Sequence, residues 1–140
     1  MRFLFWWGIF IFGVLVVLYF SWINSPRLEL NQFVPKRIAV WADKHENDNI
    51  RTAVPLVCLG GLAGLYLITY RKRNAKSWLI IWGGLVGLVA IAELGQLALP
   101  LRSADWKDVF WGAVGAALGL IMIEVLRRMR IAYKKLKNGS

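Results

Sequence analysis

The side chains best suited to chemistry lie in one short stretch, residues 93–108, which reads ELGQLALPLRSADWKD. Its ionisable and amide side chains are those of Glu93, Gln96, Arg102, Asp105, Lys107 and Asp108. An arginine presents a planar fork of N–H donors that matches the oxygens of a phosphate or carboxylate. Neighbouring carboxylates and an amide could orient such a ligand, and a poorly solvated carboxylate could act as a general base. The stretch therefore indicates a binding site for an anionic group or, as the alternative, a catalytic site.

Two polar side chains of this stretch lie inside an apolar run. Glu93 and Gln96 are three residues apart, so a helix would place both on one face. Glu93 precedes Pro100 by about two helical turns, roughly 10 Å at the helical rise per residue. A carboxylate within a membrane is costly unless it is neutralised, paired or faces a polar cavity. Arg102, just after the proline, is the expected partner, and a buried structural ion pair is the alternative to a functional site.

Asp105 and Asp108 precede the next apolar run and are also three residues apart. Carboxylates at this position complement a helix N-terminus and can accept hydrogen bonds from its free N–H groups. The two residues are therefore either helix caps or members of the site, and the sequence leaves both interpretations open.

The elements that position these residues are expected to be membrane-spanning helices. Hydrophobic residues make up 58% of the 140-residue chain, and Trp occurs 8 times. A helix of about 20 apolar residues crosses a bilayer. The runs of this kind are residues 3–23, 52–70, 78–99 and 109–126. We predict an all-α integral membrane protein, with four transmembrane helices in a small bundle and residues 1–140 forming a single domain.

The first apolar run could instead be a signal peptide, because Arg2 precedes it. Its apolar core is longer than the usual core of a signal peptide, and no clear cleavage site of small residues follows. These features favour an uncleaved span.

The basic residues indicate how the chain is oriented. One cluster, Arg71 to Lys76, follows the second run, and another, Arg127 to Lys137, follows the fourth. The connections at 24–51 and 100–108 carry acidic residues that offset their basic ones. Cytoplasmic loops carry the excess of Lys and Arg. We therefore expect both termini in the cytoplasm, residues 24–51 and 100–108 on the outer side, and no binding of nucleic acid despite the net charge of +10.

Pairs of glycines spaced four residues apart occur in the last three runs. They are Gly60 and Gly64, Gly83 and Gly87, and Gly115 and Gly119. Small residues at this spacing let membrane helices approach closely. The sequence therefore predicts tight packing of these three helices, with the aromatic-rich first helix at the periphery or against a partner.

The polar stretch and the glycines after it resemble a known family. The pattern is Glu93-x-x-Gln96-x-x-x-Pro100-x-Arg102-x-x-Asp105-x-x-Asp108, followed by Gly115-Ala116 and Gly119. It is similar to the signature of VanZ-like membrane proteins, a family named for a member linked to teicoplanin resistance. The resemblance implies a VanZ-like membrane domain over residues 1–140, located in the cytoplasmic (inner) membrane of a bacterium, with its polar residues on the outer face.

A second feature of the family precedes the second run, where Asp43 and Lys44 are followed by His45. The resemblance places Asp43 and Lys44 at the opposite wall of the site. Two positions depart from the family pattern: Asn47 stands where the family has His, and Gly112 stands where Asn is common. Chemistry that requires that imidazole or that amide is therefore not expected of this chain.

The composition narrows the classes of function. With Cys58 as the sole cysteine and His45 as the sole histidine, the sequence predicts no metal site and no cofactor, and no nucleophile–histidine pair favours an enzyme. We expect membrane lipids as partners and a site for a lipid-linked or cell-wall-related envelope component, with glycopeptide tolerance as the function that the family implies. The alternative is an accessory subunit of a larger membrane complex, packed through its aromatic first helix.

Overall fold

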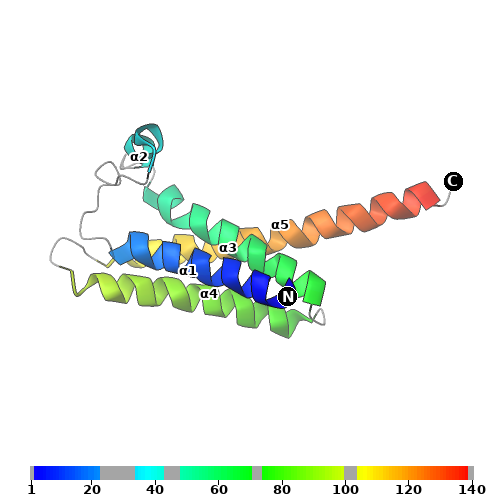
Figure 1. The fold of residues 1–140 in the computed structure, drawn as a ribbon, viewed down its shortest axis with the longest axis horizontal. Coiled ribbons are helices and arrows are strands. Elements are labelled where there is room, and N and C mark those ends of the chain that lie inside the picture. Colours follow the sequence, from blue (N-terminus) through cyan, green and yellow to red (C-terminus); the bar gives the residue numbers. More distant parts are fainter. Residues whose placement is uncertain (1, 23–33, 43–47, 71–73, 100–103, 139–140) are drawn as a thin grey trace.

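The computed structural model describes residues 2–22, 34–42, 48–70, 74–99 and 104–138, and its elements are all helices. These helices are α1 (Arg2–Trp22), α2 (Lys36–Ala42), α3 (Asp48–Tyr70), α4 (Ala75–Gln96) and α5 (Trp106–Asn138). In Figure 1, α1, α3, α4 and the first half of α5 lie side by side, whereas α2 lies beside the start of α3. The predicted all-α class is confirmed.

Three of the helices are long and apolar enough to cross a membrane, within the part of the chain that the structure describes. They contain the predicted runs 52–70, 78–99 and 109–126, apart from a few terminal residues. The described apolar part of α1, Trp6–Trp22, is shorter than these three. Length and composition thus mark three spans, and the fourth predicted span rests on the shorter α1.

Local hydrogen bonds explain where α4 and α5 begin. The Asn74 side chain accepts from the Ser77 backbone N–H at 2.9 Å, and the Asp105 Oδ1 accepts from the Lys107 N–H at 2.9 Å. Each bond satisfies an N–H of the first turn that has no partner within its helix. At its other end α4 finishes three residues earlier than predicted, because Leu97 to Leu99 form turn-type bonds such as Leu99 N–H to Gln96 O, 2.9 Å.

The closest helix pair is α3 and α5, whose backbones touch. A Cβ added at Gly60 would overlap the carbonyl oxygen of Ala116, and one at Gly119 would overlap that of Val57. Gly115 likewise faces the Ala53 carbonyl. Only residues without a side chain permit this approach, which gains van der Waals contact where lipid removes the hydrophobic drive.

The third glycine pair lies elsewhere. A Cβ added at Gly83 or Gly87 would meet nothing within 4 Å in the described part of the chain, so this pair does not bring helices together as the spacing suggested. Instead α4 meets α5 through Gly112, where an added Cβ would lie 2.9 Å from a Val89 methyl, and through the Trp82 indole N–H, which donates to the Ala113 carbonyl at 3.0 Å. A repeat of small residues does not by itself say which face of a helix meets its neighbour.

The core is small and lies between α3, α4 and α5. Its buried members are Leu56, Leu59, Ala63, Leu85, Val89, Ala116 and Leu120. α1 covers one side of this core, with Phe10 and Val17 packed against it, and leaves Phe12 68% exposed on its outer side. The apolar outer surface is the one expected to face lipid.

The second half of α5 extends past the bundle (Figure 1). Glu124 pairs there with Arg127 at 2.8 Å and with Arg128 at 2.9 Å. The basic residues after position 126 therefore continue the helix and are not a separate tail.

Candidate functional site

Glu93 and Gln96 lie in the last turns of α4, where the end of α1 and the start of α5 come together. Both side chains are buried, each with 6% of its surface exposed. Their spacing of three residues places them on one face of α4, as the sequence predicts. We call Glu93, Gln96, Ser21 and Asp105 the polar cluster.

The Glu93 carboxylate joins α4 to α5. Its Oε1 accepts a hydrogen bond from Gln96 Nε2 at 2.8 Å, and its Oε2 accepts from the backbone N–H of Asp105 at 3.1 Å. An ionised carboxylate is an acceptor only, so two N–H donors match it. Bonds to an ionised acceptor are stronger than neutral ones and offset part of the cost of burying the group.

Gln96 extends the polar cluster to α1. The Gln96 Nε2, which also contacts Glu93, lies 3.0 Å from Ser21 Oγ and donates to it. Next to it, the Trp22 indole N–H donates to the Ala92 carbonyl at 3.1 Å. A Cβ at Gly95 would overlap this indole, so the glycine makes room for it.

Ser21, Trp22 and Gly95 were not singled out as site residues from the sequence. The expected topology contains an indication of them, because it puts the ends of the first and third runs on one side of the membrane. A lone hydroxyl at the end of one run is then at the depth of the amide at the end of the other.

The two aspartates differ in their roles. Asp105 is exposed, and its carboxylate accepts from the second residue of α5, which makes it a helix cap. Asp108 lies in the first turn of α5 and is half-buried. A carboxylate there complements the positive end of the helix dipole.

Other residues of the predicted site fall outside the described residues. These are Arg102, Asp43 and Lys44, together with His45 and Asn47. Gly112, the second departure from the family pattern, is buried against Val89 on the α4–α5 contact. A larger side chain at 112 would push against Val89.

The described part of the site is a closed hydrogen-bond network. Within the described residues, every buried side-chain nitrogen or oxygen has a partner, and no group of three or more His, Cys, Asp or Glu could hold a metal ion. The arrangement can hold three helix ends and a connection in fixed positions. Positioning, more than proton transfer, is the chemistry it supports.

An all-helical chain with three helices fit to span a bilayer, and with a buried carboxylate and amide at one end of its bundle, is a membrane protein. Its family follows from comparison with known families: the VanZ/LLP1 family model matches residues 3–127, and the chain belongs to that family. The resemblance to VanZ-like proteins that the motif indicated is thereby confirmed. Comparison with curated proteins and with solved structures finds no match.

Proposed function

We propose that this VanZ/LLP1 family protein binds an anionic component of the bacterial envelope, lipid-linked or cell-wall-related, at the extracytoplasmic end of its bundle. The observation that carries the proposal is the buried Glu93 carboxylate, which bonds to Gln96 on its own helix and to the Asp105 N–H at the start of the next. These bonds fix the two ends of a short connection, and that connection contains Arg102.

Arg102 is the residue proposed to contact the ligand. Its guanidinium would pair with a phosphate or carboxylate through two parallel N–H bonds, an arrangement that a lysine cannot reproduce. Asp43 and Lys44 are proposed to form the opposite wall. The role of Glu93 and Gln96 is then to position Arg102, since their own polar atoms are engaged with each other and with neighbouring helices.

The proposed orientation places this end outside the cytoplasm. Four spans, both termini inside and a location in the bacterial cytoplasmic membrane follow from the basic clusters and from the apolar runs. The structure is compatible with this, because the ends of α1 and α4 meet the start of α5 at one end of the bundle (Figure 1).

The test is glycopeptide tolerance in cells that depend on this protein. Arg102→Ala and Glu93→Gln are expected to reduce tolerance while the amount of protein in the membrane stays within that of the wild type. Lys137→Ala, at the far end of α5, is the matched loss of a cation and should leave tolerance unchanged. Normal tolerance with Arg102→Ala at normal abundance would contradict the proposal.

A second candidate is an accessory subunit of a larger membrane complex. The observation that favours it is the outer side of α1, which exposes Ile11, Phe12 and Leu15 by 50–68%. Such a surface suits a partner helix as well as lipid. Extraction in a mild detergent tests it: migration with a large assembly, lost on Phe12→Ala, supports this function, and migration as a small particle contradicts it.

A further inference from the structure

A cavity lies between α1, α3 and α4, away from the polar cluster. Its volume is about 360 Å³, and its walls include Trp7 and Phe10 from α1, Tyr66 from α3, and Ile81 and Leu85 from α4. Sites for small molecules are commonly apolar cavities of this order of size. Leu85 and Glu93 are eight residues apart on α4, roughly 12 Å along the helix, so the cavity and the polar cluster are separate sites.

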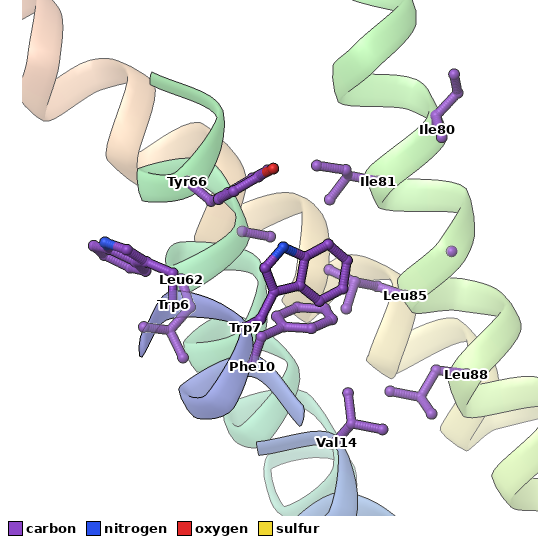
Figure 2. Close-up of a pocket in the computed structure, with 12 residues that line it drawn as sticks. Trp6, Trp7, Phe10, Val14, Leu62, Tyr66, Ile80, Ile81, Leu85 and Leu88 are labelled. Atoms are coloured by element: carbon purple, nitrogen blue, oxygen red, sulfur yellow. The ribbon is translucent and has the colours of Figure 1, made fainter. Parts of the chain in front are cut away.

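The walls of the cavity are built from packed rings and aliphatic side chains. Trp7 makes edge-to-face contacts with Phe10, at 6.5 Å between ring centroids, and with Tyr66, at 6.3 Å. Figure 2 shows the Trp7 and Phe10 rings lying between α3 and α4, with Leu85 and Leu88 opposite them. The interior offers dispersion contacts along its length and suits a hydrocarbon chain.

Polar atoms gather toward one end of this cavity. In Figure 2 the Tyr66 oxygen and the Trp7 ring nitrogen both lie on the side of Ile81, away from Val14. Tyrosine and tryptophan with this arrangement are typical of the zone where lipid tails meet headgroups. An amphiphile in the cavity would therefore have its headgroup at the Ile81 end.

A positive charge lies at that same end. Lys76 is exposed in the first turn of α4, and it is four residues before Ile80 and eight before Gly84, both of which line the cavity. Residues at this spacing lie along one stripe of a helix. The ammonium group is thus one turn beyond the cavity on the stripe that leads into it, where it favours an anionic headgroup over a zwitterionic one.

We propose that this cavity binds one hydrocarbon chain of an anionic phospholipid, with the lipid phosphate facing Lys76. Both Ile80 and Gly84 are exposed, so the cavity can be entered from the surface of the bundle. Since lipid tails in the bilayer are already away from water, the gain comes from closer packing against the rings and from the charge, not from the hydrophobic effect. The site goes beyond the proposed function and needs none of the polar cluster.

Two adjacent glycines supply the matched variants for the test. A Cβ at Gly84 or at Gly83 would meet nothing within 4 Å, so both positions accept a larger side chain without a clash. Gly84 lines the cavity and Gly83 does not. Gly84→Leu therefore fills the cavity, whereas Gly83→Leu adds the same side chain outside it.

The experiment is photo-crosslinking in phosphatidylcholine vesicles that contain a small fraction of phosphatidylglycerol with a diazirine on its acyl chain. For the wild type we expect labelled peptides covering Trp6–Val14 and Ile80–Leu88. Gly84→Leu should lose this labelling, and Gly83→Leu should keep it. Equal labelling of the two variants, or equal labelling of all exposed helix faces, overturns the proposal.

The headgroup part is tested with the same vesicles and a phosphatidylcholine probe that carries the diazirine at the same place. The wild type should be labelled more strongly by the anionic probe than by the zwitterionic one. Lys76→Gln should reduce that preference by about fivefold, the effect of one lysine near an anionic headgroup. A preference that is absent in the wild type, or unchanged in Lys76→Gln, overturns the assignment of the phosphate to Lys76.

Discussion

Replacing Glu93 by Gln removes one acceptor from the polar cluster and puts a donor in its place. In the wild type both carboxylate oxygens accept from N–H groups, those of Gln96 and Asp105. A glutamine has one oxygen, so its NH₂ group must face one of these two donors. Losing one hydrogen bond to a charged acceptor and leaving a buried donor opposed costs about 2 kcal/mol. We expect this loss in the free energy of unfolding of Glu93→Gln.

A second substitution should restore what the first removes. In the double variant Glu93→Gln, Gln96→Glu, the amide oxygen introduced at position 93 accepts from the Asp105 N–H, and the amide NH₂ group donates to the carboxylate introduced at position 96. That carboxylate can also accept from the Ser21 hydroxyl, which reverses the direction of the wild-type bond to Ser21. We therefore expect the double variant to regain more than half of the lost free energy.

The assay is equilibrium unfolding of the purified protein in mixed micelles by sodium dodecyl sulfate, followed by tryptophan fluorescence. Glu124→Gln is the control, because Glu124 accepts from Arg127 and Arg128 at a partly exposed position. Ion pairs of that kind contribute about 1 kcal/mol or less. The account of the polar cluster is refuted if Glu93→Gln is no less stable than Glu124→Gln, or if the double variant is no more stable than Glu93→Gln.

Two further predictions concern packing and orientation. Gly119→Ala should destabilise the protein by about 1–3 kcal/mol in the same unfolding assay, because its Cβ overlaps the α3 backbone. Gly87→Ala, which meets nothing within 4 Å, should stay within about 1 kcal/mol of the wild type; equal losses would contradict the α3–α5 contact. With Cys58 replaced by Ser, Lys36→Cys should react with a membrane-impermeant maleimide on intact cells, whereas Lys137→Cys should react only after lysis. The reverse pattern would contradict the proposed orientation.

Much of the fold could be predicted because long apolar runs are a strong pattern. The runs 52–70, 78–99 and 109–126 lie in α3, α4 and α5 apart from a few terminal residues. α5 continues to residue 138 because the residues after 126 include good helix formers and neither Gly nor Pro up to that point. α2 was missed, since a helix of 7 residues is too short to give a hydropathy pattern.

Half of the candidate site was likewise within reach of the sequence. The spacing of Glu93 and Gln96 puts them on one face, and their mutual hydrogen bond follows from that local geometry. The bond between Gln96 and Ser21 joins residues that are 75 positions apart, and it depends on which helices are neighbours. Hydropathy gives the number of helices and their direction, but not their order around the bundle.

The central claim is that the polar end of the bundle binds an anionic envelope component through Arg102. The most direct measurement is the affinity of the protein in nanodiscs for a polyprenyl pyrophosphate, compared among the wild type, Arg102→Ala and Lys76→Gln. Loss of a bidentate charged pair costs at least about 1.4 kcal/mol, which is about tenfold in affinity. We predict a tenfold or greater loss with Arg102→Ala and no change with Lys76→Gln at the opposite end of α4. Equal affinities of Arg102→Ala and the wild type would contradict the claim.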